Sequence, residues 1–279
     1  MDYAEPTSIE EAVELLAGTE DSRCLAGGAT LVAMINADLV EPAALISLRR
    51  IEGISDITQT SDGSIHIGAM TPHMRVAGSG LFSAGQRIVP LAADNIGHPP
   101  IRNMGTIGGS ICHADPAADY PAALCAIQAQ VEIMGPAGQR SVTARDFFID
   151  YFETALESGE MVTGVTVPKA PDNSWAAFEK IARTEGDFAT ASLALVVGFD
   201  GPICNHAGIA VGGCGPAPVW VAEAEERLVG SELDDGALEA AGALLAQACD
   251  PMEDVRGSAE YRLKLVPRLL KRAAREGEK

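Results

Sequence analysis

Two glycine pairs are the residues of this sequence with the clearest capacity to bind a ligand. Gly27-Gly28 lies in the segment LAGGATL and Gly108-Gly109 in the segment GTIGGSI, each close to small hydroxyl side chains. Glycine adopts positive φ without penalty and lets a ligand approach the main chain. Successive backbone N–H groups in such a turn form an anion-binding nest that suits a pyrophosphate. Either pair alone is more typical of a tight turn, whereas two pairs in one chain favour an anion site without deciding it.

Neither glycine pair matches a familiar nucleotide-binding loop. The sequence has no G-x-G-x-x-G after an expected strand and no G-x-x-x-x-G-K-[ST]. A dinucleotide bound at these loops would therefore use neither a Rossmann turn nor a P-loop.

The segment HADPAADYPAAL, which follows the second glycine pair, predicts the acidic start of a helix. Pro121 cannot lie deep inside a helix that begins at Asp115, because its ring would clash with the carbonyl of Ala117. A helix capped by Asp119 places Pro121 in its first turn, where proline is tolerated. Asp119 is thus an N-cap or an acceptor for the hydroxyl groups of a ligand, or both in part. Asp115 is expected in the preceding connection, exposed or capping a turn.

The remaining polar residues predict no nucleophilic triad, no catalytic acid–base pair and no metal site. His113 is the best placed of the five histidines because it follows the second glycine pair, but surface or packing roles are more typical of it. The six cysteines include no C-x-x-C pair, so neither zinc nor an iron–sulfur cluster is expected in this chain. We expect them to be reduced and mostly buried, and Cys112 to be a buried, unreactive thiol.

Length, composition and charge narrow the class of protein. The 279 residues are 47% hydrophobic with only 5% aromatic, enough for a sizeable aliphatic core in one large domain or a few small ones. The formal charge of -19 opposes binding to nucleic acid and is typical of a soluble surface or of a face for a partner protein. No apolar run reaches the length of a membrane span, and the acidic N-terminus does not resemble a signal peptide. We therefore expect a cytoplasmic protein.

Capping residues and hydrophobic periodicity predict two α/β units in the first part of the chain. In the first unit, Thr7 or Ser8 caps a helix that ends at Gly18, and a strand, the first glycine turn, an apolar helix start and the strand ALISLRRI follow. The second unit contains the strand SIHIGAM, a helix capped by Thr71 with Pro72 at its first position, the second glycine loop and several β-rich segments.

A linker at 168–174 leads to a third unit. Its strands SLALVVGFD and ICNHAGIAVGG are joined by a turn at 200–202. Helices are expected near 221–229, 235–249 and 258–275. The fold class predicted from these elements is α+β, in three units.

Several stretches in order along almost the whole chain resemble the FAD-binding subunit of the molybdenum hydroxylases. They are LAGGATLVAMINADLVEPAALISLRRI, IRNMGTIGGSICHADPAADYPAAL and FEKIARTEGDFATASLAL, with GGCGPAPVW and GSAEYRLKLVPRLLKRA matching the C-terminal part. That family includes the medium subunit of carbon monoxide dehydrogenase and the flavin domain of xanthine dehydrogenase. The resemblance implies an FAD-binding fold of the PCMH/vanillyl-alcohol-oxidase type in two subdomains, residues 1–55 and 56–170. It also implies a C-terminal α+β domain at 171–279, with a small antiparallel sheet and helices.

The resemblance also implies which residues contact FAD. In the family both glycine loops wrap the pyrophosphate, the acidic residue nine positions past the second loop contacts FAD, and the third unit reaches the flavin through a lysine, with Phe178 nearby. Relatives often carry a polar side chain where this sequence has Ala29, so any side-chain contact there is lost. The residues that carry over are Ala26, Gly27, Gly28, Ala29, Thr30, Thr106, Ile107, Gly108, Gly109, Ser110, Asp119 and, by a looser alignment, Lys180.

By the same resemblance, the chain is expected to be an oxidoreductase subunit that passes electrons through one FAD. The electrons come from [2Fe–2S] clusters of a small partner subunit and pass to NAD⁺ or another acceptor. A large partner subunit holds molybdopterin and the substrate. An αβγ heterotrimer that dimerises is the family expectation. Two alternatives stay open, a free-standing flavoprotein reductase or oxidase of the same fold and a flavin-free assembly subunit.

Overall fold

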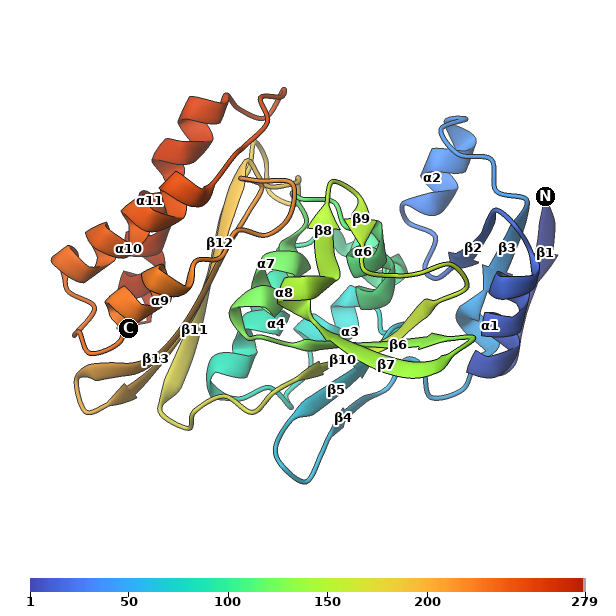
Figure 1. Ribbon diagram of the computed structural model, residues 1–279, viewed down its shortest axis with the longest axis horizontal. Coiled ribbons are helices and arrows are strands. Elements are labelled where there is room, and N and C mark those ends of the chain that lie inside the picture. The colour runs from blue at the N-terminus through green and yellow to red at the C-terminus, as the bar shows by residue number, and fades with distance from the viewer. Residues whose placement is uncertain (278–279) are drawn as a thin grey trace.

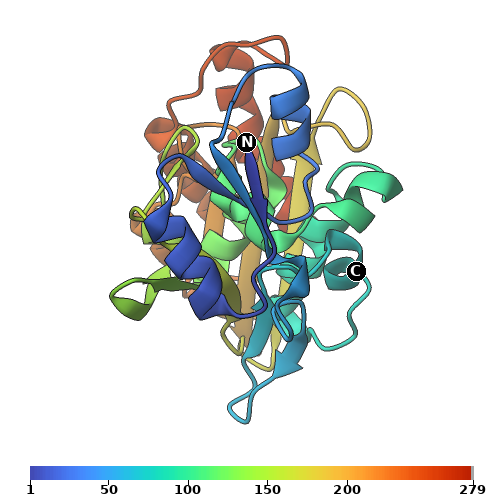
Figure 2. The same ribbon diagram turned by 90° about the vertical axis from the view of Figure 1, so that its right-hand side faces the viewer.

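The computed structural model describes residues 1–277, and its three largest sheets follow one another along the long axis (Figure 1). Figure 2 looks along that axis, with the N-terminal unit in front. This unit has a parallel sheet of order β1-β3-β2. Ser8 caps α1 by accepting a hydrogen bond from the Glu11 amide, as the sequence predicts. The bounds are β1 Asp2–Ala4, α1 Ile9–Gly18, β2 Ser22–Leu25, α2 Leu31–Asn36 and β3 Ala44–Ser47, then a 3-10 turn at Leu48–Arg50.

The middle unit is built on a five-stranded antiparallel sheet of order β4-β5-β10-β6-β7. Along β6 every second residue is buried, as expected of a strand with one face on the core. The strands are β4 Ile57–Gln59, β5 Ile65–Gly68, β6 Gln130–Gly135, β7 Gly138–Thr143, a separate hairpin of β8 Phe148–Asp150 and β9 Glu153–Thr154, and β10 Met161–Val167. The helices are α3 His73–Ala77, α4 Ile88–Asp94, α5 Pro99–Met104, α6 Ile107–His113, α7 Asp119–Ala126 and α8 Ala144–Phe147, with a 3-10 turn at Ala84–Arg87.

The third sheet is antiparallel, in the order β11-β12-β13, and helices cover both of its faces (Figure 1). Helices α4 and α7 pack on one face, and α9 and α11 on the other. Strand β12 is therefore buried on both sides, which explains its nearly continuous apolar sequence. The bounds are β11 Ser174–Ile181, β12 Ala191–Asp200, β13 Ile203–Gly212, α9 Ala222–Leu228, α10 Asp235–Ala248 and α11 Ala259–Glu276.

The structure confirms the predicted α+β class. The domain boundaries expected near residues 55 and 170 stay predictions. In the part of the chain that is described, no helix has the length and apolar character needed to cross a bilayer.

Two predicted helix caps differ from the structure. Helix α3 begins at His73 with Pro72 as its N-cap, because Pro72 forms an isolated antiparallel bridge with Thr106. The Thr71 hydroxyl is buried and has no hydrogen-bond partner among residues 1–277, so it caps nothing. Helix α7 likewise begins at Asp119 itself, and Ala118 is its N-cap. The Asp119 carboxylate turns away from the helix amides and pairs with Lys180.

Candidate functional site

The first glycine loop connects β2 to α2 and presents free backbone donors. Gly28 has a φ of +76°, which only glycine adopts without strain. Gly27 packs so tightly that an added Cβ would lie 1.7 Å from the Met104 carbonyl oxygen. Within residues 1–277, the amide N–H groups of Gly27, Gly28, Ala29 and Thr30 have no hydrogen-bond acceptor. A run of consecutive backbone donors without a protein acceptor suits an anionic ligand.

The second glycine loop forms the start of α6, and its amides are already used within the protein. Thr106 is the N-cap, and its hydroxyl accepts a hydrogen bond from the Gly109 amide at 3.1 Å. The Ile107 amide donates to the Thr71 carbonyl, and the Gly108 amide donates to the Ala69 carbonyl at 2.8 Å.

Gly108 is required for packing rather than for a turn. An added Cβ would lie 2.6 Å from the Cβ of Ala69 and 2.7 Å from its carbonyl oxygen. Gly108 and Gly109 are also absent from the positive-φ glycines of the described chain. The Ser110 hydroxyl has no hydrogen-bond partner in this part of the chain and remains able to bind a ligand.

The fold brings the two glycine loops side by side. A Cβ added at Gly109 would lie 3.6 Å from the Cβ of Ala26, and Gly27 contacts the residues that precede Thr106. The first loop therefore supplies the hydrogen-bond donors, and the second loop packs against it and holds it in place. The sequence does not distinguish these two roles, because it does not reveal which carbonyls lie opposite each amide.

Lys180 and Asp119 form a buried ion pair between β11 and α7. Lys180 Nζ lies 2.9 Å from Asp119 Oδ2 and also donates to the Asn95 carbonyl at 3.0 Å. Burial raises the pKa of Asp119 to about 6, although the nearby Lys180 ammonium acts in the opposite direction. The second oxygen, Oδ1, is buried and has no partner among the described residues. It can accept a hydrogen bond from a ligand hydroxyl, the functional role that the sequence suggests for Asp119.

The two faces of β11 serve different parts of the molecule. Phe178 and Lys180 alternate with Glu179, so they lie on the opposite face of the strand. Phe178 is half-buried against the core of the middle unit. Glu179 is buried and pairs with Arg272 of α11 at 2.8 Å.

A cleft of about 480 Å³ lies beside Lys180 and is lined mostly by polar side chains and by charged side chains of both signs. Arg102 is fixed there, because its guanidinium donates to the carbonyls of residues 94, 96 and 97. Arg102, Lys180 and Arg183 outnumber the lining carboxylates of Asp94 and Glu185, which is a local excess of positive charge in a chain of net charge -19. The sequence analysis did not predict Arg102 and Arg183 as site residues. The signal that could have identified them is that each is a basic residue close to glycines in an acidic chain. The lining residues are Asp94, Asn95, Arg102, Lys180, Ala182, Arg183, Thr184, Glu185 and Gly186.

His113 and Cys112, at the end of α6, take no part in the Lys180–Asp119 pair. The His113 ring packs against Phe152, with centroids 5.2 Å apart, and burial lowers its pKa. Cys112 is exposed, so the prediction of a buried thiol is wrong at this position. Helix α6 buries Ile107, Gly108 and Ile111, and Cys112 lies at the edge of that buried face in the last turn of the helix. The described residues contain no cluster of metal-ligating side chains.

Comparisons with known proteins cover nearly the whole chain. Residues 1–170 match the model of the FAD binding domain in molybdopterin dehydrogenase, and residues 176–277 match that of the CO dehydrogenase flavoprotein C-terminal domain. The chain is 39% identical to the carbon monoxide dehydrogenase medium chain of Afipia carboxidovorans, over 98% of this chain and 94% of that one. It is 37% identical to the 6-hydroxypseudooxynicotine dehydrogenase complex subunit alpha of Paenarthrobacter nicotinovorans, over 97% and 92%. A crystal structure of the cyanide-inactivated Cu,Mo-CO dehydrogenase superposes with a TM-score of 0.95 at 39% identity, covering 99% of this chain and 96% of that one.

Proposed function

The chain belongs to the family of FAD-binding subunits of molybdenum hydroxylases, and on that premise we propose that it is the electron-exit subunit of such an oxidoreductase. It binds one FAD, receives electrons from [2Fe–2S] clusters of a small partner subunit and passes them to NAD⁺ or another acceptor. A large partner subunit holds molybdopterin and the substrate. The complete enzyme is a cytoplasmic αβγ heterotrimer that dimerises.

The observation that carries this proposal is the run of unsatisfied amides at Gly27, Gly28, Ala29 and Thr30. Four consecutive donors, three on half-buried residues and one on the exposed Thr30, lie beside the start of α6 and suit the two negative charges of a pyrophosphate. The Ser110 hydroxyl adds a donor from the second loop. The residues present therefore fit an FAD phosphate group.

The ion pair and the cleft beside it would give the cofactor partners of a different kind. The unpartnered Asp119 Oδ1 accepts a hydrogen bond from a hydroxyl group, and Lys180 and Arg102 offer positive charge at the neighbouring cleft. FAD, when bound, supplies the redox chemistry of the enzyme. The protein residues position it, balance its charge and exclude water. This division agrees with the sequence analysis, which predicts no catalytic acid–base pair.

The first test is an absorbance spectrum of the purified chain, alone and assembled with its partner subunits, with the released cofactor identified after denaturation. We expect oxidised flavin bands and equimolar FAD. A colourless protein that does not take up FAD in either state would contradict the proposed function.

A matched pair of variants locates the site. Gly28→Ala and Gly230→Ala introduce the same left-handed strain, since both glycines have positive φ, and Gly230 has no atom within 4 Å of an added Cβ. We expect Gly28→Ala to weaken FAD binding by about tenfold or more, equivalent to about 1.4 kcal/mol. Gly230→Ala should bind FAD like the wild type. Equal affinities in the two variants would remove the first loop from the site.

A further inference from the structure

Three surface segments meet around residues 114–117, beside the end of α6. They are the β8–β9 hairpin (148–154), the loop 182–190 that follows Lys180, and the loop 249–258. The Phe152 amide donates to the Ala114 carbonyl at 3.2 Å, and the Ala189 amide donates to the Ala117 carbonyl at 3.3 Å. The last loop is connected to the same place through residues 213–214, because the Asp250 amide donates to the Cys214 carbonyl at 3.0 Å and the Gly213 amide donates to the Pro116 carbonyl at 2.8 Å.

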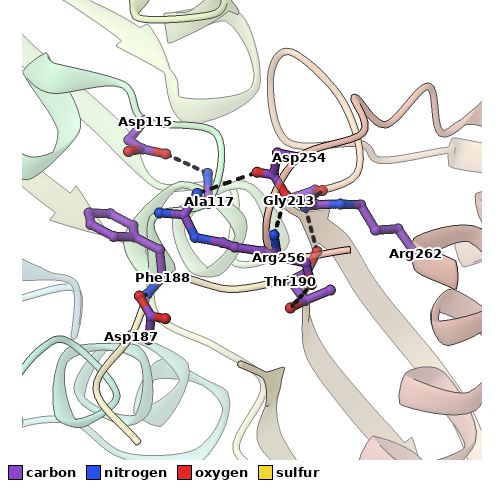
Figure 3. Close-up of polar contacts among 9 residues, drawn as sticks. All are labelled: Asp115, Ala117, Asp187, Phe188, Thr190, Gly213, Asp254, Arg256 and Arg262. Atoms are coloured by element: carbon purple, nitrogen blue, oxygen red, sulfur yellow. Dashed lines mark hydrogen bonds and ion pairs between the residues drawn. The ribbon is translucent and has the colours of Figure 1, made fainter. Parts of the chain in front are cut away.

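A buried arginine fixes the two loops to one another (Figure 3). Arg262 donates to the Thr190 carbonyl at 2.7 Å and to the Gly213 carbonyl at 2.8 Å, and it also pairs with Asp254. Arg256 lies over the Phe188 ring, 5.4 Å from its centroid. This surface is therefore rigid, and a partner that binds it loses little conformational entropy in ordering it.

Large apolar side chains on these segments are strongly exposed. The exposed fractions reach 84% at Val255, 60% at Met252 and 58% at Phe152. Phe152 also has a φ of +56°, a strained conformation for a bulky residue, and such strain is found more often at functional sites than elsewhere. We call the five exposed side chains the apolar edge: Ile149, Phe152, Phe188, Met252 and Val255.

The charges around the apolar edge are mostly negative. The three segments carry seven carboxylates and two arginines. Met252, Glu253, Asp254 and Val255 are consecutive exposed residues, so acidic and apolar side chains are presented together. A complementary surface has an apolar centre and a rim of lysine and arginine.

We propose that the apolar edge is the docking surface for the electron-donating partner subunit, which presents an apolar patch ringed by basic residues. The proposal rests on the proposed function. The loop 182–190 joins the edge to the site, because it follows Lys180 directly and supplies residues 182–186 of the adjoining cleft. Electron transfer weakens steeply with distance, so the donor subunit must dock where the flavin site reaches the surface. The apolar edge meets this requirement and has the composition of an interface.

The test measures the affinity of the full-length chain for the purified electron-donating subunit, and assembly of the co-expressed complex. Val255→Asp and Phe152→Asp place a charge on the apolar edge, and Ile203→Asp places one on an exposed apolar residue (38%) outside the three segments. We expect the first two to weaken binding by about tenfold or more, the effect of a lost interface anchor. The Ile203 variant should bind normally. Glu253→Lys should slow association and reduce its dependence on salt. Circular dichroism verifies that each variant is folded.

Three results would overturn the proposal. One is wild-type binding by both Val255→Asp and Phe152→Asp. Another is that the co-expressed complex of these variants loses only the molybdenum-bearing subunit and keeps the electron-donating one. The last is that this chain forms a dimer with itself and that Val255→Asp dissociates the dimer. FAD content is measured on the same samples. A wild-type complex without FAD would contradict the proposed function, whereas flavin-loaded variants that assemble normally would contradict only the docking surface.

Discussion

The ammonium group of Lys180 lies 2.9 Å from the carboxylate of Asp119, and both side chains are less than one tenth exposed. The pair joins β11, in the third sheet, to the first residue of α7, in the middle unit. A site that includes both residues exists only when β11 is docked on the middle unit. Under the proposed function, FAD binding and the packing of these two parts are therefore coupled.

Replacement of Asp119 by Asn should change how stability depends on pH. The folded-state pKa of Asp119 is raised to about 6 from 3.8, chiefly by burial. The folded protein consequently binds more protons than the unfolded chain between pH 4 and 6, and this group's contribution to stability falls as pH rises. Relative to Asp119→Asn, the free energy of unfolding of the wild type should fall by about 2 kcal/mol from pH 4 to pH 7. Urea denaturation of both proteins at a series of pH values measures this difference in the free energy of unfolding.

The matched control for this prediction is Asp115→Asn. Asp115 accepts a hydrogen bond from the Ala117 amide in the connection before α7, the turn-capping position that the sequence predicts, and it is only half-buried. Because the Asp115 carboxylate is a minor cause of the raised pKa of Asp119, its replacement should reduce the pH dependence only slightly, whereas Asp119→Asn removes it. A flat difference between Asp119→Asn and the wild type would mean that Asp119 is not desolvated in the folded protein.

The two neighbouring glycines at the start of α6 should respond differently to alanine. A Cβ at Gly108 meets the Ala69 backbone, so Gly108→Ala should destabilise the fold by about 1–3 kcal/mol, as overpacking does. A Cβ at Gly109 is no closer than 3.1 Å to any neighbour and lies toward Ala26 in the first loop. Gly109→Ala should therefore keep its stability but bind FAD less tightly. Thermal unfolding and FAD titration of both variants separate the two effects.

The sequence predicts most helices and strands well, because their ends carry local signals. Ser8 and the strand pair around 200–202 are examples, since each depends only on residues close in sequence. Thr71 fails as a predicted cap because Pro72 is engaged by Thr106, a residue distant in sequence. Long-range contacts of this kind are not visible in a capping motif.

The candidate site is predictable as a set of residues but not as a physical arrangement. Family resemblance, and not periodicity, connects Asp119 with Lys180, and the ion pair itself is a result of tertiary packing. The glycine pairs look equivalent in sequence, yet only the first loop keeps its amides free. Arg102 is missed because its role comes from the carbonyls of a nearby turn.

Arg145 should prove important for docking the C-terminal helices on the middle unit. Its guanidinium pairs with Glu225 of α9, donates to the Cys125 carbonyl at 3.1 Å and lies 4.2 Å from the Trp220 ring centroid. Arg145→Met leaves the mostly buried Glu225 without its counter-charge, which should cost about 3–5 kcal/mol. Denaturant unfolding measures this loss, and Trp220 fluorescence reports the lost contact. Arg275→Met removes an exposed, 3.9 Å pair with Asp235 and should change stability little. Equal effects in the two variants would contradict a docking role for Arg145.

His73 should limit the stability of the protein in acid. It is buried against Tyr120, its Nδ1 atom has no partner among residues 1–277, and its pKa is lowered from 6.5 to about 4 by burial and then by the charge of Arg102. Because the unfolded chain binds this proton more readily, stability is lost as pH falls from 6.5 to 4, the direction opposite to that of Asp119. The loss from this group should reach about 3 kcal/mol at pH 4. His73→Gln should abolish it, whereas His98→Gln, at an exposed position, should not. Parallel urea titrations of both variants at pH 4.5 and 7 test this, and an acid sensitivity unchanged in His73→Gln would assign the effect to other groups.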